Sequence, residues 1–105
     1  MVSRFDVFLI NLDETPSDDP KNSRPAVIIS PDELNRHIST VMIAPLSSTR
    51  AKYPTRLPVE FLNETRYVIL DQIQTIDKER LVKKIGQLEK DARARVTDLL
   101  LELFS

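Results

Sequence analysis

The chain has 105 residues, of which 41% are hydrophobic and 30% charged, with a formal net charge of −1 at pH 7, and we expect a single domain over residues 1–105. Zero cysteines and the lone His37 exclude a disulfide framework, a thiol nucleophile, a thiolate zinc site and a multi-histidine metal centre. No apolar run approaches the ~20 residues that cross a bilayer, so we expect a cytoplasmic protein without a membrane segment.

Three strands are predicted in the first half of the chain. Phe5 to Leu12 has a middle too apolar to face water on either side, so this strand should be central. Residues 13–23 are polar apart from two prolines and predict a surface loop. Ala26 to Ile29 forms the second strand. Thr40 to Leu46 forms the third, and Pro45 should end it because proline cannot donate into a central ladder.

A short helix is predicted between the second and third strands. Ser30 stands before Pro31 and three residues before Glu33, as in a capping box, which predicts about two helical turns through Arg36. His37 follows in a polar turn, where we expect a surface position without an acid–base role.

The second half predicts further strands and a terminal helix. Leu57 to Leu62 and Tyr67 to Ile76 are strand-like, with residues 63–65 as the turn between them. Asp77 to Leu81 predicts one helical turn and Val82 to Leu88 a last strand. Apolar residues at positions 92, 96, 99, 100 and 103 then keep helical spacing, which predicts an amphipathic helix whose stripe faces the core or a dimer partner. We therefore expect a mainly β fold with helices, in which the strands form a small, partly closed barrel.

Charge is unevenly distributed along the chain. Residues 1–20 hold one base and five acids, whereas residues 45–59 contain Arg50, Lys52 and Arg56 and no acid. A basic stripe on a nearly neutral protein is typical of a confined anionic ligand site, and equally of a solvated loop.

An arginine is fixed at the head of the second predicted strand. Arg24 precedes Pro25, and the residue before a proline is restricted to extended backbone angles. Its guanidinium can bind two phosphate oxygens at once and stays protonated, with a pKa above ~12. The alternative is an ion pair with the acidic loop, with Pro25 beginning an edge strand.

Several motifs follow in order along nearly the whole chain. They are Ser23 to Ser30 (SRPAVIIS), Asp32 to Asn35 (DELN), Thr40 to Thr49 (TVMIAPLSST), Asp71 to Asp77 (DQIQTID) and Lys84 to Gly86 (KIG). In this arrangement the chain closely resembles the MazF/PemK family of toxin endoribonucleases of type II toxin–antitoxin systems. The resemblance implies an SH3-like (CcdB/MazF-type) β-barrel with a C-terminal α-helix, acting as a homodimer.

The resemblance also implies an activity and a partner. The activity is sequence-specific, metal-independent cleavage of single-stranded RNA (mRNA), which inhibits translation and needs no cofactor. The partner is a cognate antitoxin that covers the RNA groove with a segment disordered until it binds.

By the same resemblance, Arg24 and Ser47 are the catalytic positions, and Asp71 takes the acid–base role assigned in the PemK branch. That branch places an arginine two residues before the aspartate, where this chain has Ile69, so its mechanism does not transfer whole. Many relatives also have an arginine where Gln74 stands.

Cleavage without a metal needs a base for the ribose 2′-hydroxyl, charge that stabilises the phosphorane, and an acid for the departing 5′-oxygen. Arg24 suits the second task and Ser47 can donate to the charged phosphate oxygen, while the base remains open between Asp71 and water. Hydroxyl, amide and cationic side chains near these positions predict the RNA contacts. The candidates are Lys21, Ser48, Thr49, Arg50, Lys52, Arg56, Gln72 and Gln74.

Two other functions fit a barrel of this type. A CcdB-like gyrase poison uses a tryptophan-containing carboxyl end, whereas this chain has no tryptophan and ends Glu102-Leu103-Phe104-Ser105. A non-catalytic RNA- or protein-binding barrel fits the acidic loop and Gln74. Relatives often carry glycine where Phe5 stands, and glycines in the loop that is acidic here.

Overall fold

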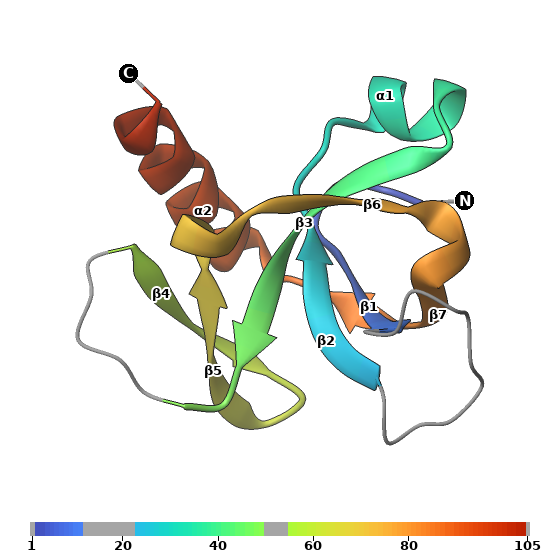
Figure 1. Ribbon diagram of the computed structural model, residues 1–105. Coiled ribbons are helices and arrows are strands. Elements are labelled where there is room, and N and C mark those ends of the chain that lie inside the picture. The colour runs from blue at the N-terminus through green and yellow to red at the C-terminus, as the bar shows by residue number, and fades with distance from the viewer. Residues whose placement is uncertain (1, 12–22, 50–54, 105) are drawn as a thin grey trace.

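The computed structural model describes residues 2–11, 23–49 and 55–104 (Figure 1). In chain order the elements of this part are β1 (Asp6–Asn11), β2 (Ser23–Ile28), α1 (Asp32–His37), β3 (Thr40–Ser47), β4 (Arg56–Phe61), β5 (Glu64–Ile69), the 3-10 turn η2 (Leu70–Gln72), β6 (Gln74–Asp77), the 3-10 turn η3 (Lys78–Arg80), β7 (Leu81–Gln87) and α2 (Lys90–Leu103). The predicted loop over residues 13–23 lies outside the described residues, except for Ser23, which begins β2.

The described strands form one antiparallel sheet that curls into a half-barrel (Figure 1). Their order is β4-β5-β3-β2-β1-β7, and β6 pairs with β3 outside this path. β1 lies between β2 and β7, which confirms its predicted central place. The small β-barrel with a C-terminal helix that the sequence predicts is therefore confirmed.

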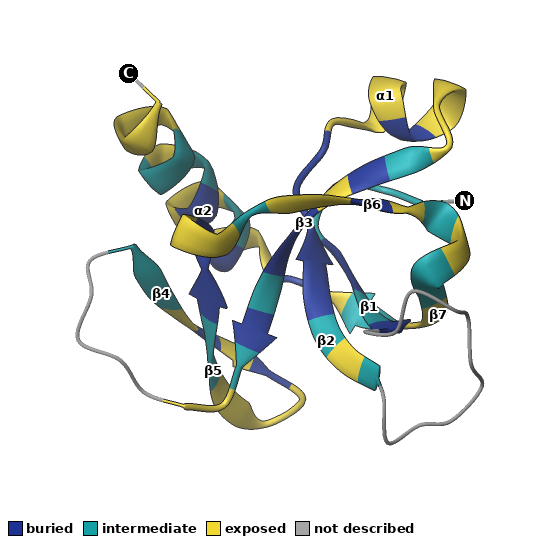
Figure 2. Cartoon of the chain, viewed as in Figure 1, coloured by how far each residue is buried: buried dark blue, intermediate teal, exposed yellow. Residues whose placement is uncertain are grey.

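Much of β2 and β3 is buried (Figure 2), and the apolar side chains of the sheet divide between two clusters. Val7 and Val27 point to one side, into a cluster that also includes Val96 of α2. Ile28 and Ile43 point to the other side, where Ile10, Ala26, Val41 and Ile76 complete a second cluster. β2 therefore has packed neighbours on both faces, which keeps its polar end in a fixed position.

The terminal helix packs on the first of these clusters. Ala92 and Val96 are buried, and Leu99 and Leu100 are partly buried against the same cluster, as the predicted stripe requires. Arg95 Nη1 donates to the carbonyl of Pro58 at 2.9 Å and so links α2 to β4. Leu103, the last apolar position of the stripe, is exposed instead of buried.

The predicted capping box is wrong. The cap position of α1 is Pro31, with no side-chain cap bond. Ser30 is buried, and its Oγ donates to Asn35 Oδ1 at 2.5 Å and accepts from the Met42 N–H at 3.1 Å. The hydroxyl therefore joins α1 to β3 and does not cap the helix. His37, at the end of α1, is exposed as expected.

The strand predicted from Tyr67 to Ile76 is also wrong, because the chain turns at η2 and returns as β6 to pair with β3. The hairpin before it turns at Leu62 and Asn63, whose φ angles of 51° and 65° are typical of a two-residue hairpin turn. Glu64 and Thr65, predicted as turn residues, already belong to β5.

Phe5 adopts a φ of 72°, in the region where glycine meets no steric penalty. Its N–H donates to the Ile28 carbonyl at 2.7 Å, and its own carbonyl accepts from the Leu88 N–H at 3.0 Å. These bonds hold the conformation, although an L-residue there is less favourable by roughly 1–2 kcal/mol. The conformation gives a physical reason for the glycine that relatives carry at this position.

Candidate functional site

A groove opens where β3 stops pairing with β2. β2 and β3 are paired up to Ala26 opposite Pro45. On the opposite edge of β3 the partner changes from β6, paired as far as Ile43, to β5, paired at Leu46 and Ser47. Pro45 has no N–H to donate to β2, and Pro25 on the facing strand has none either. The two strands separate at these prolines. Pro45 therefore does not end β3, as the sequence predicted, but marks the residue after which it leaves β2.

The groove has a volume of about 430 Å³. Its walls come from β1, β2, β3, β5 and β6 and the turn after β3. The described lining residues are Ile10, Arg24, Pro25, Pro45, Leu46, Ser47, Ser48, Thr49, Arg66, Ile69 and Gln74. Two of them are arginines, and no carboxylate belongs to this described lining. The groove is therefore suited to an anionic ligand.

Arg24 is exposed at the start of β2, opposite Ile10 of β1. Its Nη1 donates to the carbonyl of Ser23 at 2.8 Å, which steadies the guanidinium at the groove wall. The acidic loop of the alternative ion pair lies outside the described residues.

Ser47, the last residue of β3, is half-buried. Its Oγ accepts a hydrogen bond from the Thr49 N–H at 3.1 Å, which folds the exposed Ser48 and Thr49 along the groove. Because this bond uses an acceptor lone pair of Ser47, the hydroxyl proton stays available to donate to a ligand. The structure thus brings Arg24 and Ser47 together in one groove.

Asp71 is not one of the lining residues. It lies in η2, where it accepts from Thr55 Oγ1 at 2.9 Å and faces Arg56 Nε at 3.5 Å. The Thr55 hydroxyl, followed by the aspartate's own backbone and Arg56, lowers the pKa of Asp71 below its ordinary value. A carboxylate held ionised in this way is a poor acceptor of protons near neutral pH.

The remaining predicted contacts divide into three groups. Ser48, Thr49 and Gln74 line the groove. Arg56 and Gln72 do not belong to its described lining. The last group lies outside the described residues and consists of Lys21, Arg50 and Lys52.

Sequence reasoning missed one cation of the groove. Arg66 comes from β5, and its side chain is 26% exposed. The alternation of the strand identifies it as a polar residue before Val68, but no local pattern reveals that β5 lies beside the end of β3. Finding Arg66 requires the strand pairing, which only the folded chain provides.

A second cavity, of about 560 Å³, lies between α2 and β3. Apolar side chains dominate its described lining, which consists of Arg4, Ile29, Pro31, Met42, Ile73, Thr97, Leu100, Leu101 and Phe104. Three of these, Met42, Leu101 and Phe104, are large apolar residues that are exposed. Its composition is that of a packing surface and offers little to a charged substrate.

The part of the chain that the structure describes contains neither a cluster of metal ligands nor a membrane-spanning helix. Within residues 2–11, 23–49 and 55–104, no three His, Cys, Asp or Glu side chains gather as metal ligands do. In the same ranges, no helix combines the length and apolarity needed to span a bilayer.

The chain matches one protein family over residues 3–104, described as "PemK-like, MazF-like toxin of type II toxin-antitoxin system". Solved structures are similar too. An endoribonuclease in complex with its cognate antitoxin from a mycobacterial species is 24% identical with a TM-score of 0.82, and the match covers 97% of this chain and 93% of that chain. The Mycobacterium tuberculosis toxin MazF-mt6 is 24% identical with a TM-score of 0.77, over 94% and 95% of the two chains. A MazE–MazF complex from Deinococcus radiodurans is 20% identical with a TM-score of 0.80, over 99% and 95%.

Proposed function

The chain belongs to the PemK-like, MazF-like family of toxins of type II toxin–antitoxin systems, and from this premise we propose that it is a sequence-specific, metal-independent endoribonuclease. Its substrate is single-stranded RNA, above all mRNA, and its cleavage inhibits translation. The observation that carries the proposal is the groove in which Arg24, Ser47 and Arg66 meet without an acidic residue among the described lining residues. An RNA phosphate entering there meets two guanidinium groups and the Ser47 hydroxyl.

In the proposed reaction, the ribose 2′-hydroxyl loses its proton and attacks the adjacent phosphorus to form a 2′,3′-cyclic phosphate, while the 5′-oxygen of the next nucleotide leaves and takes up a proton from water. Arg24 binds two phosphate oxygens and stabilises the charge that builds on the phosphorane. The Ser47 hydroxyl donates its proton in a hydrogen bond to the same charged group. Both side chains act by electrostatic stabilisation, which is strongest when donors are fixed before the substrate arrives.

The proton acceptor stays open between a water molecule and Asp71. Two observations favour water. Asp71 is not among the lining residues of the groove, and its lowered pKa makes it a weak base. Asp71 stays a prediction as the acid–base residue, and the alternative role for its carboxylate is to hold Thr55 and Arg56 beside η2.

Neutralisation by a cognate antitoxin is part of the proposal. Two of the similar solved structures are described as complexes, one with a cognate antitoxin and one as MazE–MazF. A disordered antitoxin segment that folds on the groove would meet the same two arginines that we assign to RNA. Acidic side chains would complement them, and the segment would compete directly with the phosphate backbone.

We also propose that the working unit is a homodimer formed through the apolar cavity beside α2. Phe104 is 76% exposed at the rim of this cavity, and Leu101 beside it is 66% exposed. An exposed Phe104 ring next to an apolar cavity makes this surface self-complementary under two-fold symmetry, because the ring of each subunit can enter the cavity of the other subunit. Sedimentation equilibrium tests this, and a species that stays at 12.1 kDa at micromolar concentration would refute it.

The activity is tested on the purified chain without antitoxin, using a long unstructured RNA in the presence of EDTA. We expect discrete cuts, which end mapping locates. Arg24→Ala should abolish them, and Arg24→Lys should lose most activity because a point charge cannot replace a bidentate fork. Arg36→Ala is the matched control, since Arg36 is an exposed arginine on α1.

Each result has a separate meaning. Full activity in Arg24→Lys would refute the role given to the guanidinium fork. Intact RNA together with inhibited gyrase supercoiling would favour a gyrase poison instead. RNA that is bound and left uncut would favour a non-catalytic binding barrel.

A further inference from the structure

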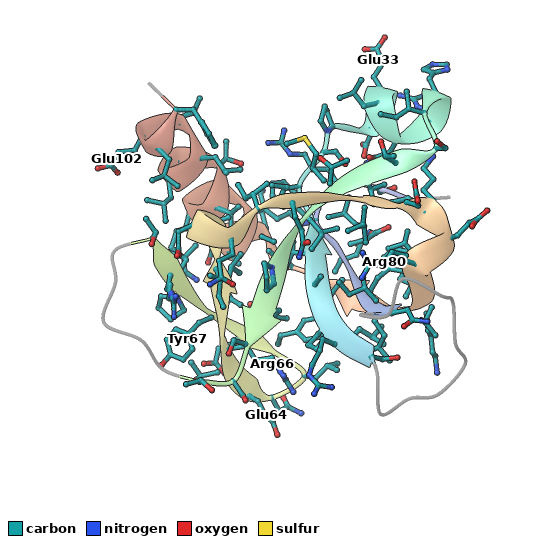
Figure 3. The ribbon with its side chains drawn as sticks, in the orientation of Figure 1. Glu33, Glu64, Arg66, Tyr67, Arg80 and Glu102 are labelled. Carbon is teal, nitrogen blue, oxygen red and sulfur yellow. The ribbon has the colours of Figure 1, made fainter. Side chains whose placement is uncertain are left out.

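Arg66 is the second cation of the described groove lining, and it stands at neither of the two positions where the resemblance implies an arginine. These positions hold Ile69, which is buried, and Gln74, which lines the groove. Arg66, three residues before Ile69 on β5, lines the groove with Arg24 and Ser47. Figure 3 shows Arg66 and Tyr67 extending to opposite sides of β5. The groove therefore has a guanidinium on each side of Ser47's strand, one from β2 and one from β5.

The partner that Arg66 has in the structure is weakly held. Its Nη2 pairs with Glu64 Oε2 at 3.1 Å, and the Glu64 side chain is 65% exposed (Figure 3). Ion pairs at such exposed positions add little to stability because water and salt screen them. Glu64 can thus be displaced by a stronger and better placed anion, and a phosphate that accepts two hydrogen bonds from the guanidinium is one.

We propose that Arg66 binds the RNA phosphate next to the one held by Arg24 and Ser47, and that Glu64 leaves it when RNA enters. This inference rests on the proposed function. A single-stranded backbone presents phosphates in succession, so two arginines on separate strands of one groove can hold two of them. Arg66 then positions the strand and contributes to RNA affinity, whereas Arg24 acts on the reacting phosphate.

Replacing Arg66 should therefore change binding rather than turnover. With Arg66→Ala we expect KM for the cleaved RNA to rise about tenfold or more, and kcat to stay within about twofold. Loss of one phosphate contact should also reduce the slope of log K against log salt concentration by about 0.7, the value for single strands. Arg66→Lys should keep most of that slope while it weakens binding, because the charge remains and the fork is lost.

Glu64 provides a test in the opposite direction. Glu64→Gln removes the competing carboxylate while it keeps the size of the side chain, so RNA should bind several-fold more tightly. Arg36→Ala is the control for Arg66→Ala: it removes one positive charge outside the described lining of the groove and should leave KM and the salt slope unchanged. Far-UV circular dichroism and thermal unfolding of each variant confirm that it is folded.

Binding is measured separately from cleavage by fluorescence anisotropy with a 2′-O-methyl single-stranded RNA. The probe covers the mapped cut site, or has mixed sequence if no cut is found. Unchanged affinity and salt slope in Arg66→Ala, with wild-type cleavage intact, would overturn the inference and leave the proposed function standing. A fall in kcat at constant KM would overturn it as well. A wild type that binds this probe but leaves the unmodified RNA uncut, with the slope reduced in Arg66→Ala, would support the role of Arg66 and refute the nuclease. A wild type that neither cuts nor binds would refute both.

Discussion

Removing the hydroxyl of Ser47 tests the electrostatic mechanism most directly. One lone pair of Ser47 Oγ accepts a hydrogen bond from the Thr49 N–H at 3.1 Å, so the hydroxyl proton of Ser47 is available to donate to the substrate. Loss of one such donor raises a barrier by ~2.7–4 kcal/mol. Ser47 is half-buried, so we take the lower end, which corresponds to a fall in kcat of about a hundredfold for Ser47→Ala. Ser47→Thr keeps the hydroxyl and should stay active.

The measurement must separate two effects of Ser47→Ala: the loss of the hydroxyl as a hydrogen-bond donor, and a displacement of the turn after β3. Single-turnover cleavage of a short RNA at saturating enzyme gives the chemical rate, and its concentration dependence gives the affinity. A displaced turn would weaken affinity, whereas a missing donor slows the chemical step. Ser39→Ala is the matched control, because it removes an exposed serine hydroxyl outside the described lining of the groove. A chemical rate in Ser47→Ala within tenfold of wild type, or an inactive Ser47→Thr, would refute the reasoning.

Two further predictions concern stability. The lowered pKa of Asp71 means that its ionised form stabilises the fold at neutral pH and that this contribution is lost as pH falls below the ordinary value of 3.8. Asp71→Asn should therefore unfold at a lower temperature than wild type at pH 7, with the difference shrinking toward pH 3, and a constant difference would contradict the linkage. Gly86→Ala should destabilise by about 1–3 kcal/mol, because an added Cβ would lie 2.9 Å from Cε1 of the buried Phe61 ring. Urea unfolding checks this, with Phe61→Leu as a second substitution expected to relieve the contact, and an unchanged midpoint in Gly86→Ala would refute it.

The fold was predictable where a local pattern determines it. A continuous apolar run predicted β1 as a central strand, which is confirmed, and the 3.6-residue spacing predicted the stripe of α2, which is confirmed at Ala92, Val96, Leu99 and Leu100 but not at Leu103. Residues 67–76 were predicted as one strand, because apolar residues lie on both sides of the polar residues of the turn, up to Leu70 before them and at Ile73 after them. Asp71 and Gln72, which interrupt that run, are exposed in the turn. Their polarity marked the turn between β5 and β6, although these two residues were predicted to lie inside one strand.

Part of the candidate groove was predicted, and this prediction rested on a family resemblance and not on a local pattern. Arg24 and Ser47 were predicted by resemblance, and Arg24 also stands before a proline that restricts its backbone. Arg66 was missed because its place in the groove depends on which strands become neighbours. The pairing of β5 with β3 at Leu46 and Ser47 is a long-range contact that leaves no periodic signal in the residues of β5.

The charge of the groove explains how a nearly neutral chain can bind a polyanion. A net charge of −1 provides no general attraction to RNA, and charges more than about 8 Å apart are largely screened at physiological salt. Under the proposed function, RNA binding must therefore come from cations that contact the backbone inside the groove. Among the described residues these are Arg24 and Arg66, and we expect each of them to carry a large share of the affinity. An antitoxin that occupies Arg24 and Arg66 together would remove that affinity without altering the fold, so control of this chain can act by competition alone.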